Sequence, residues 1–242
     1  MFITGPCSLT SYELGLEEAK AAKSLGATYF RAGCYKPRTY PNTFQGLRNE
    51  GLEILCRIRQ EVGIKVITEV VEAEEVKPYL NDIDMIQIGS RNCQNFELLK
   101  TVSKWHKPVL LKRGFGMKIE ELYGAAAYLR DASEVVLCER GIRTFETLTR
   151  NTIDYSLIPI TRHRGLPYKV IIDPSHGVGI SQYVLPMAQA ALAAGADGVM
   201  IEATFNPSNS PTDAMQMVTF EQLKKLVGWA SQHNYLDELF KD

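Results

Sequence analysis

Short apolar segments recur along the chain and alternate with longer segments whose apolar residues follow helical spacing. The predicted strands are Phe2–Gly5, Tyr29–Ala32, Lys65–Val70, Met85–Gly89, Pro108–Lys112, Glu134–Cys138, Val170–Asp173 and Gly198–Glu202. The predicted helices are Ser11–Leu25, Gly51–Val62, Glu72–Leu80, Asn95–Trp105, Ile119–Leu129, Thr144–Tyr155, Val184–Ala194 and Phe220–Phe240. Eight strands that alternate with helices, without an intervening linker, predict an α/β fold: a parallel (β/α)8 TIM barrel forming a single domain.

A doubly wound open sheet is the competing arrangement for alternating strands and helices. That fold places a glycine-rich phosphate-binding turn after its first strand. Here the first strand is followed by Gly5-Pro6-Cys7-Ser8, which lacks the required glycine spacing. The length of 242 residues also suits a single barrel domain.

Composition and charge exclude several functional classes. The net charge of −1 argues against a nucleic-acid or anionic-membrane surface, each of which favours a basic excess. Five cysteines without a Cys-x-x-Cys pair predict neither a disulfide framework nor a structural zinc site. No charged leader precedes the first apolar segment and no long apolar run follows. These features predict a cytoplasmic protein.

Polar and reactive residues follow every predicted strand. In a parallel barrel these positions converge on the face where active sites lie. The residues are Cys7, Arg31, Lys36, Arg38, Glu69, Arg91, Lys112, Arg113, Glu139, Arg140, Asp173, His176 and Glu202. If the chain forms a barrel, the sequence therefore predicts one charged site at its carboxyl-terminal rim.

The densest cationic stretch runs from Arg31 to Pro41 and contains Arg31, Lys36 and Arg38 beside Thr39. Clustered cations at the mouth of a buried sheet repel one another unless an anion binds between them. A solvated basic loop, or ion pairing of single cations with nearby acids, is the alternative. As a set, the cations predict a site for more than one phosphate or carboxylate. This set comprises Arg31, Lys36, Arg38, Arg91, Lys112 and Arg140.

A second group combines a thiol, an imidazole and two carboxylates: Cys7, His176, Glu202 and Asp213. Each has an ordinary alternative role, as a small buried residue, a capping imidazole or a loop carboxylate. Together, this mixture of soft and hard ligands suits one divalent transition metal, and Mn²⁺, Fe²⁺, Co²⁺ and Zn²⁺ all fit it. Their spacing along the chain is not a metal motif, so the prediction depends on the barrel.

Several motifs, in order, resemble those of one enzyme family over nearly the whole chain. They are Gly5-Pro6-Cys7-Ser8, Lys36-Pro37-Arg38-Thr39, Gln45-Gly46-Leu47, Gln87-Ile88-Gly89-Ser90-Arg91-Asn92, Leu111-Lys112-Arg113-Gly114, Cys138-Glu139-Arg140-Gly141-Ile142-Arg143-Thr144 and Asp173-Pro174-Ser175-His176. The chain thus resembles the short microbial type I beta class of 3-deoxy-D-arabino-heptulosonate 7-phosphate (DAHP) synthase, the entry enzyme of the shikimate pathway and of aromatic amino-acid biosynthesis.

The resemblance implies a TIM barrel that joins phosphoenolpyruvate to erythrose 4-phosphate and releases phosphate. By it, the metal ligands are Cys7, His176, Glu202 and Asp213. The phosphoenolpyruvate site is Arg31, Lys36, Arg91, Lys112 and Arg140, and the aldose phosphate is held by Arg38 and Thr39. Proton transfer and water activation then fall to Lys36 and to Glu69 or Asp173, because ammonium and carboxylate groups can act as general acids and bases.

The chain departs from the family pattern at Tyr40, where serine is common, and at Thr204-Phe205-Asn206-Pro207, where His-Pro is common. Because the predicted elements fill residues 1–242, we expect neither a fused ferredoxin-like regulatory domain nor a chorismate mutase domain. We also expect a homo-oligomer, a dimer or tetramer. Trp229 is one apolar residue that could contribute, unless it packs on its own barrel.

Two other functions remain open from the sequence. The chain is similar in barrel, metal set and phosphoenolpyruvate site to 3-deoxy-D-manno-octulosonate 8-phosphate synthase, which uses a five-carbon aldose phosphate. That enzyme typically lacks the Lys-Pro-Arg-Thr motif found here at 36–39. A non-catalytic barrel that only binds phosphate ligands is the second alternative, although every candidate ligand and cation is present.

Overall fold

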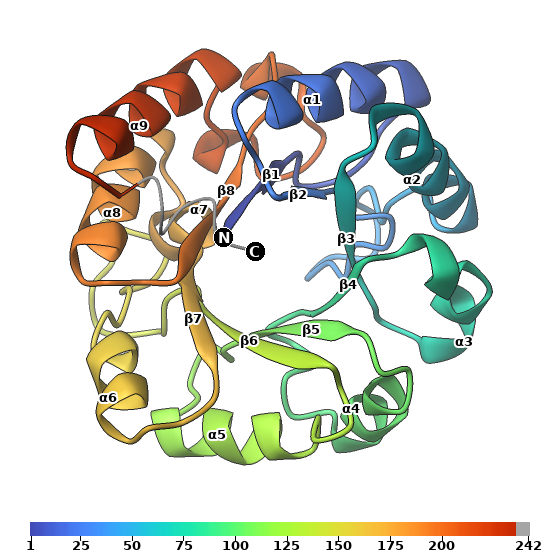
Figure 1. The fold of residues 1–242 in the computed structure, drawn as a ribbon. Helices are drawn as coiled ribbons and strands as arrows, with labels where there is room; N and C mark the ends of the chain where they lie inside the picture. Colours follow the sequence, from blue (N-terminus) through green and yellow to red (C-terminus); the bar gives the residue numbers. More distant parts are fainter. Residues whose placement is uncertain (236–242) are drawn as a thin grey trace.

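The computed structural model describes residues 1–235, and in this range the chain closes into a barrel of eight parallel strands (Figure 1). The strands are β1 (Phe2–Gly5), β2 (Tyr29–Arg31), β3 (Lys65–Glu69), β4 (Met85–Ile88), β5 (Pro108–Lys112), β6 (Glu134–Glu139), β7 (Lys169–Ile172) and β8 (Gly198–Glu202). Each strand pairs with its sequence neighbours, and β1 pairs with β8 through registers such as Ile3 with Met200. The predicted TIM barrel is confirmed.

The barrel interior changes from apolar to polar along the strands. Every second side chain of a strand points inward. The apolar part is a cluster of Met1, Ile3, Tyr29, Ile67, Met85, Leu110, Val136, Cys138, Ile171 and Met200. Two residues further along six of these strands or their loops, the side chain is polar: Arg31, Glu69, Gln87, Lys112, Asp173 and Glu202. The chain alternation therefore places a polar layer directly above the apolar filling.

Helices surround the strands and cover their outward apolar side chains (Figure 1). They are α1 (Tyr12–Ser24), α2 (Asn49–Val62), α3 (Ala73–Val76), η1 (Lys77–Asp82), α4 (Phe96–Ser103), α5 (Ile119–Ala127), α6 (Leu157–His163), α7 (Pro174–Val178), α8 (Ser181–Ala193), η2 (Pro207–Asn209), η3 (Ala214–Gln216) and α9 (Phe220–Gln232). Helix α2 shows the pattern best, since Leu52, Leu55 and Ile58 are fully buried and Gly63 ends it in the left-handed conformation.

All eight strands lie within one or two residues of their predicted limits. The difference at β7 affects the site: this strand ends at Ile172, so Asp173 lies after it and caps the N-terminus of α7. The segment predicted as the helix Glu72–Leu80 divides into α3 and the 3-10 helix η1. The predicted helix Phe220–Phe240 ends at Gln232, and its positions from 236 onward lie outside the described residues.

The predicted helix Thr144–Tyr155 is wrong. This segment is a loop that forms an antiparallel bridge between Ile142 and Thr152, and the helix α6 begins only afterwards. Side chains compete with helical hydrogen bonds here, because Thr144 accepts from the Glu146 amide and the Glu146 carboxylate accepts from the Leu148 amide. Two large apolar residues of this segment are exposed: Phe145 is 98% and Leu148 is 80% accessible.

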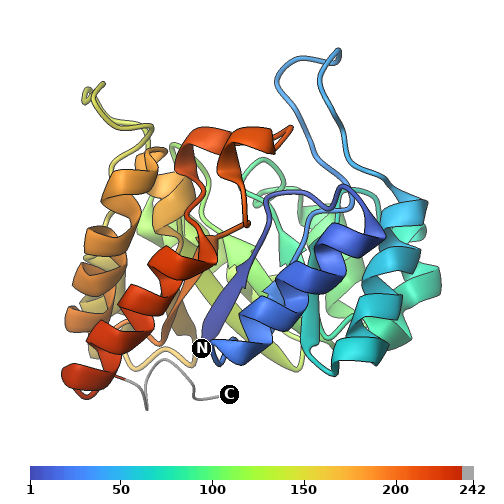
Figure 2. The same ribbon diagram turned by 90° about the horizontal axis from the view of Figure 1, so that it is seen from above.

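Two loops rise on either side of the barrel mouth, while the N-terminus lies at the opposite end (Figure 2). One connects β2 to α2 and carries the cationic stretch, and the other follows β6. None of the helices in the described range is long and apolar enough to cross a membrane. All five cysteines are buried, and each carries a free thiol.

The apolar filling should dominate the stability of the barrel. Ile171 is fully buried within it. We expect Ile171→Ala to lower the free energy of unfolding by about 2–5 kcal/mol, because the substitution leaves a cavity. Lys224→Ala, at an exposed position of α9, should change it by less than about 0.5 kcal/mol. Urea denaturation measures both values, and equal effects of the two substitutions would contradict the assigned packing.

Candidate active site

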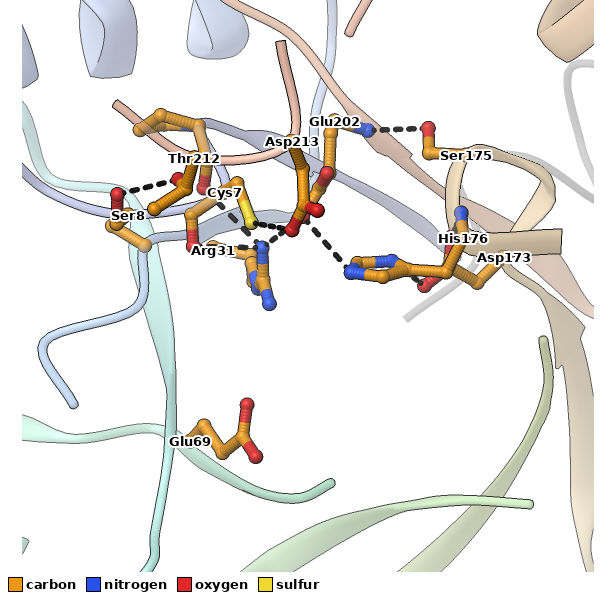
Figure 3. Close-up of polar contacts among 12 residues, drawn as sticks. Cys7, Ser8, Arg31, Glu69, Asp173, Ser175, His176, Glu202, Thr212 and Asp213 are labelled. Carbon is orange, nitrogen blue, oxygen red and sulfur yellow. Dashed lines mark hydrogen bonds and ion pairs between the residues drawn. The ribbon is translucent and has the colours of Figure 1, made fainter. Parts of the chain in front are cut away.

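The four predicted metal ligands meet at the carboxyl-terminal ends of β1, β7 and β8 (Figure 3). One ligand atom each from Cys7, His176, Glu202 and Asp213 lies within 4.8 Å of the other three. The Cys7 thiol donates to Asp213 Oδ2 over 2.9 Å, and His176 Nε2 lies 3.4 Å from Glu202 Oε1. Residues separated by more than 200 positions are therefore joined by the closure of the barrel.

The orientation of His176 is fixed by Asp173. The Asp173 carboxylate accepts the His176 backbone amide at 2.9 Å and lies 2.7 Å from Nδ1. A proton held on Nδ1 by this contact leaves Nε2 with its lone pair directed toward the cluster. Burial lowers the pKa of the imidazole, although Asp173 and Glu202 act in the opposite direction. A metal would bind the neutral form of this ring at Nε2.

Glu202 is fully buried and is held on both carboxylate oxygens. Arg31 Nη1 donates to Oε1 over 2.6 Å, and Gln216 Nε2 donates to Oε2 over 2.7 Å. The backbone amide of Glu202 also donates to Ser175 Oγ. Burial opposes ionisation of this carboxyl group, but the charges of His176 and Arg31 lower its pKa. Glu202 therefore stays anionic inside the barrel.

Cys7 and Asp213 complete the cluster from opposite termini of the chain. Burial, followed by the charge of Glu202, raises the pKa of the Cys7 thiol to about 12. Burial also opposes ionisation of Asp213, but Lys36 and His176 hold its pKa below the usual range. The thiol is therefore protonated and hydrogen-bonded to a carboxylate. A divalent cation would displace this proton, since thiolate is the form that binds metal.

The donor set fits a divalent transition metal. With Cys7 as thiolate, the thiolate and two carboxylates supply three negative charges, and a divalent ion leaves one in excess. Lys36 Nζ lies 2.8 Å from Cys7 Sγ and 3.8 Å from Asp213 Oδ2, so that a cation faces the remaining charge. Four such donors can surround one ion at roughly 2.0–2.3 Å after small side-chain movements.

A pocket of about 300 Å³ opens beside this cluster and contains nearly all the predicted cations. The charged residues that line it are Arg31, Lys36, Arg38, Glu69, Arg91, Lys112, Arg140, Arg150, His176 and Asp213. The cations outnumber the acids, so the pocket suits an anionic ligand. The structure thus brings together both groups that the sequence predicted separately.

Arg140 is the residue that most clearly indicates an anion-binding site. Its side chain is 2% accessible, yet no carboxylate of residues 1–235 forms an ion pair with it. Its hydrogen bond is to the Gly141 carbonyl, and its guanidinium lies 4.7 Å from the centre of the Phe115 ring. Burial lowers its pKa to about 10. A buried cation in this state is stabilised when a phosphate or carboxylate enters the pocket.

Arg31 and Lys112 line the same pocket but are partly engaged by the protein. Arg31 donates to Glu202, to Gln87 and to the Pro6 and Cys7 carbonyls. Lys112 Nζ lies 2.5 Å from Asp173 Oδ2. The guanidinium nitrogen Nη2 of Arg31 forms no hydrogen bond within the described range, so Arg31 can still donate to a ligand.

Arg38, Thr39 and Arg91 lie at the outer part of the pocket. Arg91 Nη2 donates to Thr39 Oγ1 over 3.4 Å, which links the loops after β2 and β4. Arg38 and Arg91 form no ion pair within residues 1–235. These side chains are more accessible than Arg140, so this end of the pocket is suited to a second, more solvated anion.

Glu69 stands on the side of the pocket away from the metal ligands (Figure 3). Gln87 Nε2 donates to one of its oxygens over 3.1 Å, and Gln87 in turn accepts from Arg31. A side chain at Gly89 would place its Cβ 2.0 Å from Glu69 Oε1. The glycine of the Gln-Ile-Gly motif therefore provides the space that this carboxylate occupies.

Sequence reasoning missed several residues that support the site. Gln87, Gln216 and Arg150 hold the predicted residues in place, and Phe115 packs against three guanidinium groups. Gln87 could have been found, since it lies two positions after the inward-facing Met85. Arg150 lies in an irregular loop and Gln216 in the short 3-10 helix η3, and neither segment has a sequence signal that predicts its path. Two of the predicted rim residues, Arg113 and Glu139, form an ion pair with each other and support the fold instead of lining the pocket. Arg113 also pairs with Asp154.

Comparison with known families matches residues 1–237 to the family described as DAHP synthetase I. A Thermotoga maritima protein named phospho-2-dehydro-3-deoxyheptonate aldolase is 43% identical over 228 residues, which cover 93% of this chain and 67% of the relative. A Desulfotalea psychrophila protein named 2-dehydro-3-deoxyphosphooctonate aldolase is 32% identical over 94% of this chain and 87% of its own length.

Two solved structures from Thermotoga maritima match the fold. The crystal structure of its DAHP synthase has a TM-score of 0.92 and 39% identity, covering 99% of this chain and 70% of that one. A truncated form of 3-deoxy-D-arabino-heptulosonate 7-phosphate synthase has a TM-score of 0.88 and 37% identity, covering 99% and 88%.

The cluster geometry predicts the effect of removing the thiol. We expect Cys7→Ser to weaken Mn²⁺ or Co²⁺ binding at least about 100-fold, because serine offers a poor anionic ligand at neutral pH. Cys93→Ser should leave metal affinity unchanged, since Cys93 is buried outside the cluster and bonds to the Ser90 carbonyl. Isothermal titration of both variants tests this, and equal affinities would remove Cys7 from the ligand set.

Proposed function

The chain belongs to the DAHP synthetase I family, and we propose that it condenses phosphoenolpyruvate with erythrose 4-phosphate. The products are 3-deoxy-D-arabino-heptulosonate 7-phosphate and inorganic phosphate, the first step of the shikimate pathway. The observation that carries this proposal is the single pocket in which a four-residue metal cluster faces buried and exposed cations. The metal cluster suits the aldehyde oxygen of one substrate, and the cations suit the phosphate and carboxylate groups of both substrates.

The cations align two substrates that would repel one another in water. We assign phosphoenolpyruvate to the inner part of the pocket, where Arg140 and Lys112 are buried and Arg31 and Lys36 have free donor capacity. The phosphate of the aldose falls to Arg38 and Thr39, with Arg91 between the two sites. Holding reacting carbons together in this way is worth several kcal/mol, very roughly ~5 or more.

The metal would be held by Cys7, His176, Glu202 and Asp213, and when bound it polarises the aldehyde oxygen as a Lewis acid. Lys36 is within contact distance of this cluster and also lines the pocket. A carbon–carbon bond forms between the enol carbon and the aldehyde, and the oxygen of the former aldehyde requires a proton. We assign delivery of that proton to the Lys36 ammonium.

The second half of the reaction adds water to the electron-poor carbon that carries the phosphate, after which phosphate departs. The sequence left Glu69 and Asp173 as candidates for the acid–base group. Asp173 is fully buried between His176 and Lys112, which outweigh burial and keep its pKa well below the usual range. Glu69 lines the pocket and accepts one hydrogen bond from Gln87. We therefore assign water activation to Glu69 and a positioning role to Asp173.

A second candidate function is the condensation of phosphoenolpyruvate with arabinose 5-phosphate, which the octulosonate relative at 32% identity supports. Parallel assays with the two aldose phosphates, with and without chelator, distinguish these reactions through phosphate release. We expect release with erythrose 4-phosphate that the chelator abolishes. Release with arabinose 5-phosphate alone would favour the second function, and release with neither would favour a non-catalytic barrel.

We also propose that the chain self-associates as a dimer or tetramer. Phe145 and Leu148 lie exposed on the loop after β6, at the barrel mouth, and a second copy would cover them. Trp229, considered from the sequence, is half-buried and stacks on His233 and Tyr235 of its own chain. Light scattering of the intact protein and of the Phe145→Ser variant would measure the mass, and a monomer in both would contradict this.

The assignment of Lys36 predicts a specific loss. We expect Lys36→Met to lower kcat by roughly 10²–10⁴-fold at saturating metal, because the alkyl chain keeps the packing but supplies no proton. Metal content, measured on the same samples, should be unchanged. Near-normal turnover would remove Lys36 from the reaction, and a parallel loss of metal would make it a support of the cluster instead.

A further inference from the structure

A second pocket of about 140 Å³ lies outside the candidate active site, between the loop after β1 and the loop after β8, and its wall includes the apolar residues Leu14 and Phe205. Its charged residue is Glu18 of α1, and no lysine or arginine lines it. The remaining polar side chains are neutral oxygen donors: Ser8, Thr10, Thr204, Asn206, Asn209 and Ser210. This composition is the reverse of the cation-rich catalytic pocket.

Glu18 is unusual for a carboxylate on the outer layer of a barrel. Its side chain is 1% accessible, and no cation in the described part of the chain pairs with it. The Thr204 hydroxyl donates to Oε1 over 2.5 Å, whereas Oε2 has no hydrogen-bond partner among residues 1–235, and Glu18 lines the pocket. Burial raises the pKa of this carboxyl group to about 7. Burying an ionised carboxylate without a partner is costly, so a cation in the pocket would stabilise it.

We propose that this pocket binds a small monovalent cation of the potassium class, with Glu18 as the charged ligand. One carboxylate surrounded by hydroxyl and amide oxygens offers hard ligands with a single negative charge. A monovalent ion neutralises that charge, whereas a divalent ion would leave an excess positive charge in a buried place. The volume admits one ion with a few water molecules, each of which occupies about 30 Å³.

The location gives this cation a consequence for the active site. The loop after β1 carries Cys7 next to Ser8, and the loop after β8 carries Asp213 next to Thr212. Ser8 Oγ and Thr212 Oγ1 are hydrogen-bonded over 2.8 Å, beside Cys7 on the side away from His176 (Figure 3). An ion bound between Ser8, Glu18 and Thr204 would join the two loops at a second point. It would thereby fix the relative positions of three metal ligands, Cys7, Glu202 and Asp213.

Thermal unfolding of the divalent-metal-loaded protein tests the proposal, since the catalytic ligands are then occupied. We expect potassium chloride to raise Tm by about 3 °C over choline chloride at equal ionic strength, with saturation, because binding stabilises the folded state. Glu18→Gln keeps the shape and an acceptor for Thr204 but removes the charge, and it should abolish the difference. The matched control is Glu13→Gln, at an exposed position of the same helix, which should retain it.

An equal potassium effect in Glu18→Gln, or no difference between potassium and choline in the unmodified protein, would overturn the site and leave Glu18 a protonated structural residue. If Glu18→Gln fails to fold, thallium(I) NMR of the unmodified protein in nitrate salts decides. We expect one bound thallium(I) per chain that potassium displaces and choline does not. Absence of this binding contradicts the proposal.

Discussion

The buried ion pair between Arg31 and Glu202 is the interaction on which the arrangement of the site depends. Its two charges lie 2.6 Å apart and are 2% and 1% accessible. Arg31 also donates to the Pro6 and Cys7 carbonyls and to Gln87. One guanidinium therefore fixes the backbone beside one metal ligand, the carboxylate of another, and through Gln87 the orientation of Glu69. Removing either member would leave an uncompensated buried charge, which costs about 3–5 kcal/mol.

The site as a whole balances charge over short distances. On the metal side, acids exceed cations by an amount that a divalent ion nearly neutralises. On the substrate side, cations exceed acids, and no carboxylate of residues 1–235 forms an ion pair with the buried Arg140. Both imbalances lie within one pocket, so an ion and anionic substrates satisfy them together. The barrel makes this possible because its apolar filling ends one layer below the polar residues.

Much of this arrangement was predictable because side-chain alternation in a parallel strand is strict. Arg31, Glu69, Lys112, Asp173 and Glu202 lie at or just after the carboxyl ends of predicted strands, which all meet at one end of a parallel barrel. Alternation then turns these side chains toward the interior. The loop after β6 was not predictable from spacing, since hydrogen bonds of Thr144 and Glu146 to nearby amides replace the expected helix. Likewise, Arg150 reaches the site from an irregular loop, Gln216 from the short 3-10 helix η3, and Asp213 from a left-handed backbone conformation.

Cys7, His176, Glu202 and Asp213 should bind one divalent ion as a set. Titration with Co²⁺, followed by absorption spectroscopy, shows whether the thiol is a ligand, because a cobalt–thiolate bond produces a sulfur-to-metal charge-transfer band. We expect this band to grow to one equivalent of Co²⁺, to be absent from Cys7→Ser and to remain in Cys93→Ser. Binding of Co²⁺ without the band, or a band that persists in Cys7→Ser, would show that Cys7 is not part of the site.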